Sequence, residues 1–221
     1  MKHLTKPLPA YKNTLVLNPD PMVAVYNDFV DGSICKYIIN LAKNQMQPAK
    51  VSLEKEAGLI ESRSNTNCWI HYHTDPVIQQ LGQRVSELVG ISFSHAEALQ
   101  VIHYLPNQEY KAHFDAYDLY TENGQHFSKW GHQRITTVIL YLNDVEEGGS
   151  TNFPKLEIDV SPKLGKIVIF NNVGESIMTP HPLSLHSGQP VIKGEKWACN
   201  LWFHARPMTE QQDFSEIGKD L

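Results

Sequence analysis

The sequence predicts an α+β fold in which helices pack on one face of an antiparallel sheet or barrel. Two observations lead to this prediction. Apolar residues at helical spacing are confined to the first 90 positions, and from Ala96 onward they form short strand-like runs separated by Pro, Gly and Asn. The chain has 221 residues and a hydrophobic content of 41%. A chain of this size can bury a substantial core, so we expect one large domain.

The first elements of this fold are predicted to be an arm, a strand and a helix. Residues 1–21 contain four prolines and little apolar periodicity, which indicates an extended N-terminal arm. Residues 22–30 are typical of a strand. Asp31 can then cap a helix that we expect to end near Met46, because the apolar residues between them fall on one stripe.

A second helix is predicted after a short strand at residues 67–72. Its start is indicated by Asp75 followed by Pro76, because proline is well tolerated in the first helical turn. Apolar residues then continue at helical spacing until Gly90, which is typical of a helix end. The polar stretch at residues 50–64 predicts no regular element.

The remaining elements are predicted strands. They lie at residues 99–105, 134–142, 166–170 and 197–204. Residues 207–221 are polar and are expected to form a loosely held C-terminal tail.

Charge and composition exclude several classes of function. The net charge of −5 provides no basic surface, so we expect no nucleic-acid partner. No apolar run is long enough to span a membrane, and residues 1–20 lack the apolar centre of a signal peptide. The three cysteines are widely spaced, without a CxxC motif, and are expected to be buried free thiols. We therefore expect a soluble, cytoplasmic protein that does not bind membranes.

The strongest functional signal is a set of metal-ligand residues. His113 and Asp115 are two positions apart, and His186 follows 73 positions after His113. Two histidines and one carboxylate form the facial triad of non-heme Fe(II) oxygenases. On a strand, residues i and i+2 project from the same face, roughly 6.6 Å apart. His113 and Asp115 can therefore converge on one ion if they lie on a strand or at its end.

The last predicted strand has a polar face that includes Lys196, Asn200 and Trp202. Such a row is unusual for a surface strand but suits the lining of a polar cavity. A buried lysine needs a counter-anion, because an unpaired ammonium is costly to bury. A dicarboxylate cosubstrate would supply one. Tyr104 and Tyr110, which precede His113, could reach the same cavity.

Three segments resemble the prolyl 4-hydroxylase family of Fe(II)/2-oxoglutarate-dependent dioxygenases, of bacterial or viral type. They are residues 104–115, residues 133–151 with a Glu-Gly-Gly turn, and residues 185–197 with a Lys-Gly-Glu-Lys-Trp run. The resemblance extends from about Met22 to His204, and Arg63-Ser-Asn matches a weaker arginine motif of the same family.

The resemblance implies a double-stranded β-helix, or jelly-roll, with N-terminal supporting helices. Residues 22–206 would form the single dioxygenase domain. The Fe(II) ligands, which are the catalytic centre, would be His113, Asp115 and His186. Lys196 would pair with the distal carboxylate of 2-oxoglutarate, helped by Tyr104 and Thr151. The implied substrate-binding residues are Arg134, Tyr110, Trp202 and Arg63.

The activity that the resemblance implies is hydroxylation of peptidyl proline at C4, as in procollagen-proline 4-dioxygenases. The enzyme would consume O₂ and 2-oxoglutarate, release succinate and CO₂, use ascorbate as a reductant, and bind a proline-containing peptide or protein. Ser150 and Asn200 depart from the family pattern, and the aromatic segment 116–133 is a predicted lid.

Two alternatives remain open at this point. One is an oxygenase on the same scaffold that hydroxylates another side chain, a free amino acid or a small molecule. The other is a non-catalytic, cupin-like metal-binding barrel.

Overall fold

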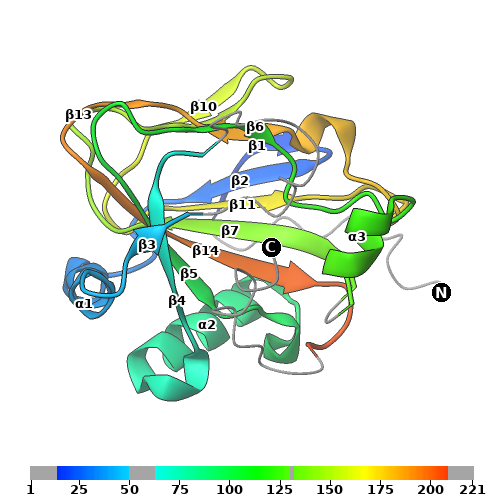
Figure 1. Ribbon diagram of the computed structural model, residues 1–221, viewed down its shortest axis with the longest axis horizontal. Coiled ribbons are helices and arrows are strands. Elements are labelled where there is room, and N and C mark those ends of the chain that lie inside the picture. The colour runs from blue at the N-terminus through cyan, green and yellow to red at the C-terminus, as the bar shows by residue number, and fades with distance from the viewer. Residues whose placement is uncertain (1–13, 50–62, 130–131, 209–221) are drawn as a thin grey trace.

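The computed structural model describes residues 14–49, 63–129 and 132–208 (Figure 1). Most of the predicted tail at residues 207–221, and residues 1–13 of the predicted arm, lie outside this description. The rest of the arm is more ordered than the sequence predicted. Residues 15–19 form a strand, β1 (Leu15–Pro19), which pairs with β2 (Met22–Tyr26) and so belongs to the main sheet.

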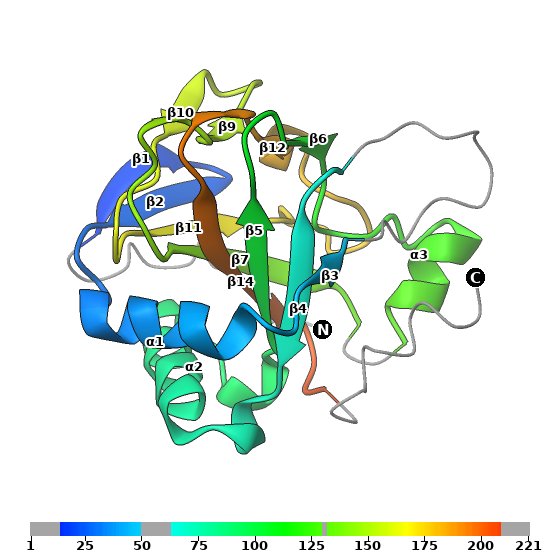
Figure 2. The same ribbon diagram turned by 60° about the vertical axis from the view of Figure 1, so that its left-hand side comes forward.

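Two antiparallel sheets form the body of the protein, with a short two-stranded sheet beside them (Figures 1 and 2). The large sheet has the strand order β1-β2-β11-β7-β14-β5-β4-β3. Its strands after β2 are β11 (Ile167–Asn171), β7 (Arg134–Tyr141), β14 (Lys196–His204), β5 (Leu99–Tyr104), β4 (Thr66–Ile70) and β3 (Gln47–Pro48). The small sheet has the order β10-β9-β12-β6, formed by β10 (Ile158–Val160), β9 (Thr151–Phe153), β12 (His186–Gly188) and β6 (Tyr110–His113). The short sheet pairs β13 (Val191–Lys193) with β8 (Glu147–Gly148).

Both faces of the large sheet carry apolar side chains that are buried against other elements. One face packs against the helices α1 (Gly32–Ala42) and α2 (Pro76–Val89); in Figure 1, α2 lies below the sheet and α1 to its lower left. The other face packs against the small sheet, where Phe153 and Val160 meet Phe170 and Ile139. The predicted α+β class is therefore confirmed, and the arrangement is a jelly-roll of two facing sheets with helices outside one of them.

The helix starts follow from capping, as predicted. The Asp31 carboxylate accepts the Ser33 backbone N–H at 2.7 Å, and the Asp75 carboxylate accepts the N–H groups of Val77 and Ile78 at 2.9 and 3.1 Å. The first helix is shorter than predicted, because its regular part ends at Ala42 and the two-residue strand β3 follows. Within the predicted strand 67–72, β4 ends at Ile70 and a 3₁₀ turn begins at Tyr72. Short elements at 93–95, 122–127 and 182–184 were not predicted.

The three cysteines are buried free thiols in the core between the helices and the large sheet, as the sequence predicted. Cys68 and Cys199 both lie opposite Val101, one on each side of β5. They are therefore two strands apart, or about 9.6 Å, which is too far for a disulfide. Burial raises the pKa of the Cys68 thiol to about 11, so it stays protonated.

The central strand β14 divides its side chains between the two faces, as predicted. Trp197, Cys199, Leu201 and Phe203 join the helix-side core. The alternate residues face the small sheet, and β14 lies between β5 and β7. This register sets Lys196 opposite Tyr104 and Trp202 opposite Thr137. Among the described residues, no helix is long and apolar enough to cross a membrane.

Candidate active site

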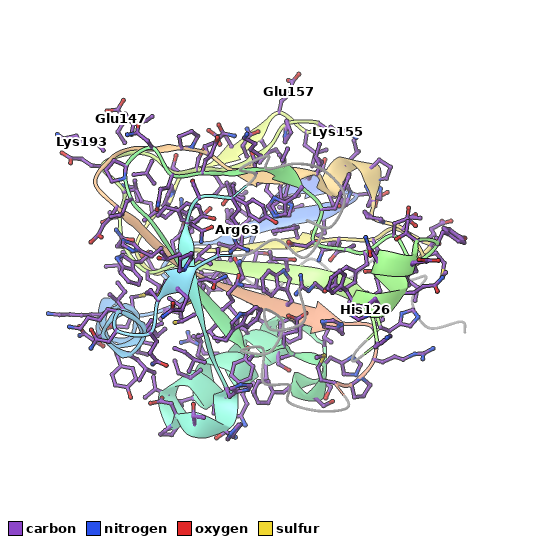
Figure 3. All side chains as sticks on the ribbon, in the orientation of Figure 1. Arg63, His126, Glu147, Lys155, Glu157 and Lys193 are labelled. Atoms are coloured by element: carbon purple, nitrogen blue, oxygen red, sulfur yellow. The ribbon has the colours of Figure 1, made fainter. Side chains whose placement is uncertain are left out.

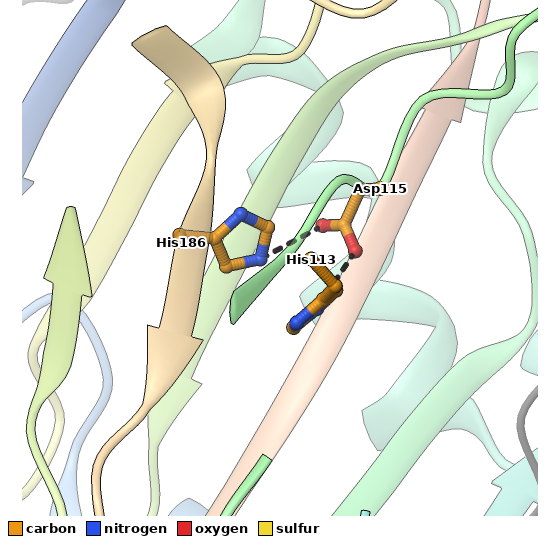
Figure 4. Close-up of side chains that lie close together, drawn as sticks. All are labelled: His113, Asp115 and His186. Carbon is orange, nitrogen blue, oxygen red and sulfur yellow. Dashed lines mark ion pairs between the residues drawn. The ribbon is translucent and has the colours of Figure 1, made fainter. Parts of the chain in front are cut away.

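His113, Asp115 and His186 come together at the small sheet (Figure 4). His113 on β6 lies opposite His186 on β12, and Asp115 follows just after the end of β6. The Nε2 atoms of His113 and His186 each lie 3.6 Å from a carboxylate oxygen of Asp115. One ligand atom from each residue falls within 4.8 Å of the others. The structure therefore brings together the three residues that the sequence selected.

Both imidazole rings are oriented by the backbone. His113 Nδ1 lies 2.8 Å from the carbonyl oxygen of Lys111, and His186 Nδ1 lies 3.0 Å from that of Ser184. A carbonyl oxygen can only accept, so each Nδ1 carries a proton, and each Nε2 points toward Asp115, where it can offer a lone pair to a metal. Histidine ligands of metals are commonly fixed in this way. Two neutral imidazoles and one carboxylate form a donor set that fits Fe(II).

The charges in this cluster also suit a cation. Burial by itself would raise the pKa of Asp115. The neighbouring His186, together with His113 and Arg134, outweighs this effect and holds the pKa of Asp115 well below its usual range. Burial lowers the pKa of His186 to about 4. At neutral pH the cluster thus contains a buried carboxylate beside a neutral His186, and a bound cation would compensate its charge.

Lys196 provides a second charged group, at the start of β14. Its side chain is 3% exposed, and its ammonium lies 5.4 Å from the ring centres of both Tyr104 and Tyr141. In the described part of the chain, no hydrogen bond or ion pair reaches this ammonium. Burial lowers the pKa of Lys196 to about 7, although the charge of Asp159 opposes the shift. A buried amine without an acceptor suits the binding of an anion.

Hydroxyl groups accompany this amine. Thr151 is buried, and its hydroxyl lies 2.8 Å from the Tyr141 hydroxyl, which also lies 3.2 Å from the carbonyl oxygen of Val160. Tyr104 is also buried. A Cβ placed on Gly188 would lie 3.5 Å from the Tyr104 hydroxyl and 3.8 Å from Tyr110 Cβ. Gly188, on the same strand as His186, therefore lies close to both tyrosines.

Arg63 and Tyr110 lie beside the metal-ligand cluster. The Tyr110 ring stacks on His113, with 3.6 Å between ring centres. The guanidinium of Arg63, which is labelled in Figure 3, lies 4.7 Å from the Tyr110 ring centre. Arg63 also donates to Asn65 Oδ1 at 2.7 Å. This places both predicted substrate residues near His113, and their contact with a substrate stays a prediction.

Arg134 and Trp202 are engaged inside the protein. Arg134 Nε and Nη2 donate to the two carboxylate oxygens of Glu97 at 2.6 and 2.8 Å. The Trp202 ring centre lies 4.0 Å from the Arg134 guanidinium, and its Nε1–H donates to Asp115 Oδ2 at 2.9 Å. Substrate binding by these two residues also stays a prediction. The sequence did not indicate that Trp202 would hydrogen-bond to Asp115 or that Arg134 would pack on Trp202.

Glu97 is the buried anion that fixes Arg134, and the sequence analysis did not select it. Its carboxylate also contacts His204 Nε2. Burial would raise the pKa of Glu97, but the charges of Arg134 and His204 outweigh burial and lower it to about 2. An available signal was its position between Ala96 and Ala98 in an otherwise apolar run, because carboxylates are seldom buried unless paired.

The two ends of the predicted lid, residues 116–133, are hydrogen-bonded to each other. The side-chain oxygen of Gln133 accepts the Tyr117 N–H at 2.7 Å, and its Nε2 donates to the carbonyl oxygens of Tyr117 and Ile177 at 2.6 and 3.0 Å. The segment contains the short helix α3 (Glu122–Phe127), and residues 130–131 lie outside the described residues. Both ends of the segment are thus joined beside the metal-ligand cluster.

Comparison with protein families matches residues 99–204 to the 2OG-Fe(II) oxygenase superfamily. The chain is 33% identical over 208 residues to probable prolyl 4-hydroxylase 10 of Arabidopsis thaliana, with 85% of this chain and 70% of the relative covered. It is also 33% identical over 182 residues to a putative prolyl 4-hydroxylase of Acanthamoeba polyphaga mimivirus, with 82% and 74% covered.

Solved structures give the same fold. The viral collagen prolyl hydroxylase of Paramecium Bursaria Chlorella virus-1, in its 2OG complex, matches with a TM-score of 0.66 and 28% identity, covering 83% of this chain and 96% of that one. A Pseudomonas putida prolyl-4-hydroxylase has a TM-score of 0.53 and 17% identity, with 83% and 92% covered, and supports the fold alone. The double-stranded β-helix expected from the sequence is thereby confirmed.

Replacement of Glu97 should strongly destabilise the protein. In Glu97→Ala, the Arg134 guanidinium stays buried without its carboxylate, so we expect a loss of about 3–5 kcal/mol in the free energy of unfolding. Urea denaturation would measure the loss. The control is Glu146→Ala, which removes an exposed pair with Lys193 at the edge of the molecule (Figure 3) and should cost about 1 kcal/mol or less. Equal losses in the two variants would contradict this account of Glu97.

Proposed function

Because this chain belongs to the prolyl 4-hydroxylase family of 2OG-Fe(II) oxygenases, we propose that it hydroxylates prolyl residues at C4 in a peptide or protein substrate. The chain is a 2-oxoglutarate-dependent dioxygenase, and Fe(II) and 2-oxoglutarate are its cofactor and cosubstrate. The non-catalytic barrel considered from the sequence is set aside. The prolyl substrate is supported by the names of plant and viral relatives that match most of the chain.

The observation that carries the proposal is the pairing of two complementary charged groups. The carboxylate of Asp115 lies between two imidazoles and suits a metal cation, while the buried ammonium of Lys196 suits an anion. An Fe(II) ion and a dicarboxylate cosubstrate satisfy both requirements together.

Each residue has a role in this proposal. His113, Asp115 and His186 hold Fe(II). Lys196 pairs with the distal carboxylate of 2-oxoglutarate as a point charge, and the buried hydroxyls of Thr151 and Tyr104 donate hydrogen bonds nearby. When bound, Fe(II) and 2-oxoglutarate supply the oxidising chemistry, in which O₂ is consumed, succinate and CO₂ are released, and one oxygen atom enters a substrate C–H bond.

The remaining residues of the site would handle the substrate. Tyr110 and Arg63 lie against His113 and offer an aromatic face and a guanidinium to an entering peptide. Aromatic side chains are the usual surface for proline-rich segments, because such segments are preorganised and apolar. Arg134 has two nitrogen atoms bound to Glu97 and could reach a substrate through its remaining nitrogen. Ascorbate is proposed as the external reductant.

The direct test is anaerobic reconstitution with Fe(II) and 2-oxoglutarate, followed by O₂ and a panel of proline-containing peptides. We expect succinate together with a peptide that has gained one oxygen atom on proline, measured by mass spectrometry. His113→Ala should abolish both products, because it removes a proposed metal ligand.

The other outcomes are equally informative. Succinate without peptide oxidation would refute the prolyl substrate and favour an oxygenase acting on another compound. If neither succinate nor 2-oxoglutarate binding is detected, the proposed function is wrong.

Lys196 should be essential for binding 2-oxoglutarate. In Lys196→Ala the distal carboxylate loses its counter-charge, and we expect a loss of about 2–5 kcal/mol of binding free energy. Calorimetric titration of the metal-loaded protein would measure it. Lys193→Ala is the matched control, because that lysine is exposed on β13 and pairs with Glu146. Undiminished binding by Lys196→Ala would show that the anion site is elsewhere.

Binding of 2-oxoglutarate should take up a proton at mildly alkaline pH. The pKa of Lys196 is about 7 in the free protein, so above that pH its amine is largely neutral. A bound carboxylate favours the ammonium form of Lys196 and raises its pKa. The number of protons taken up per 2-oxoglutarate bound should therefore be larger at about pH 8 than at about pH 6. Titrations in buffers of different ionisation enthalpy would measure it. Lys196→Arg, which stays charged, should show no such increase, and equal uptake in both proteins would contradict the assignment.

A further inference from the structure

The two oxygen atoms of Asp115 have different surroundings. Oδ2 accepts hydrogen bonds from Thr137 Oγ1 at 2.7 Å and from Trp202 Nε1 at 2.9 Å. Among the described residues no hydrogen bond reaches Oδ1. Each oxygen lies 3.6 Å from a histidine Nε2, Oδ1 from that of His113 and Oδ2 from that of His186. A carboxylate oxygen has two lone pairs, so Oδ2 is fully used and Oδ1 is not.

We propose that Thr137 and Trp202 are positioning residues, which fix the Asp115 carboxylate through Oδ2 and, in the described part of the chain, leave Oδ1 without a protein donor at the metal site. This inference rests on the proposed function, because it concerns the same metal site. A carboxylate that binds through both oxygens would take an additional coordination position. With Oδ2 held by two donors, the carboxylate would keep one orientation when the metal is bound.

The hydroxyl of Thr137 has a fixed direction. Its oxygen accepts a hydrogen bond from Asn172 Nδ2 at 2.8 Å. Because an amide N–H can only donate, the single hydroxyl hydrogen of Thr137 is directed to Asp115. Asn172 and Thr137 are both fully buried, so water does not compete for these bonds. The hydrogen bonds from Asn172 to Thr137 and from Thr137 to Asp115 therefore point in the same direction and can strengthen each other.

The indole of Trp202 is held from both sides. The Arg134 guanidinium lies 4.0 Å from its ring centre, and the Trp69 ring centre lies 5.8 Å away. Arg134 is in turn fixed by its two hydrogen bonds to Glu97. Outer groups of this kind set the orientation of a metal ligand and commonly change metal affinity when they are replaced.

Both donors come from the large sheet, whereas the three proposed ligands come from β6, β12 and the turn after β6. Trp202 on β14 and Thr137 on β7 are paired directly in the sheet register. The inter-strand pairing thus aligns two donors on one oxygen of a residue that belongs to the opposite sheet. This alignment explains a threonine and a tryptophan at these inward-facing positions without reference to a substrate.

The chain contains its own matched controls. Thr136 precedes Thr137 on β7, is equally buried, and projects from the opposite face, where its hydroxyl lies 3.4 Å from Asn171 Oδ1. Trp197 is a buried tryptophan on the helix-side face of β14. Thr136→Val and Trp197→Phe therefore remove a buried hydroxyl and a buried indole, respectively, that make no hydrogen bond to Asp115.

The experiment uses Co(II) as a spectroscopic metal in the full-length protein without cosubstrate. We expect Thr137→Val and Trp202→Phe each to weaken Co(II) binding by about 10–100-fold and to change its visible absorption, because Asp115 can then rotate or bind through both oxygens. Thr137→Ser, which keeps the hydroxyl, should restore both the affinity and the spectrum. Thr136→Val and Trp197→Phe should match the wild-type protein in both.

Thermal unfolding of each variant shows whether it is folded. If Thr137→Val does not fold, the Co(II) affinity and spectrum of Trp202→Phe test the inference. Folded Thr137→Val and Trp202→Phe variants with wild-type Co(II) affinity and spectrum would overturn the inference while leaving the proposed function intact. A wild-type protein that binds no Co(II), with the same result for Fe(II), would instead overturn the proposed function.

Discussion

The structure depends on the burial of one carboxylate between two sheets. Asp115 leaves the small sheet at the end of β6, and its Oδ2 atom is bound by Thr137 and Trp202 from the large sheet. A buried carboxylate is costly unless hydrogen bonds and a positive charge compensate it. The two hydrogen bonds supply part of this compensation and fix the distance between the sheets at that point. Burial keeps the neighbouring His186 neutral, so the remaining charge is available to a cation.

Three buried charged groups around the site are compensated in three different ways. Glu97 is paired inside the protein with Arg134 and His204. Asp115 is partly compensated by neutral donors, and Lys196 has no acceptor among the described residues. The ion pair between Glu97 and Arg134 contributes rigidity, because it holds the Arg134 guanidinium against the ring of Trp202. The two incompletely compensated groups carry opposite charges, which is why a cation and an anionic cosubstrate fit the same protein.

The position of each group follows from strand register. β14 lies between β5 and β7, so one strand places Lys196 opposite Tyr104 and Trp202 opposite Thr137. The proposed anion site and the support of Asp115 are therefore six residues apart on a single rigid strand. A shift of one residue would turn these side chains into the helix-side core. The apolar residues Trp197, Cys199, Leu201 and Phe203 oppose such a shift, because it would expose them to the polar side.

The sequence by itself determined the α+β class, the caps of both long helices, the alternation along β14, and the choice of His113, Asp115, His186 and Lys196 as chemical groups. These features depend on local periodicity or on residue types that are rare in a core. Only the tertiary structure decided that Glu97 pairs with Arg134, that Thr137 supports Asp115, and that Gln133 joins the two ends of the 116–133 segment. Each of these contacts joins residues at least 16 positions apart in the sequence. Threonine and glutamine are common residue types, so their partners are set by sheet register and packing rather than by any local pattern.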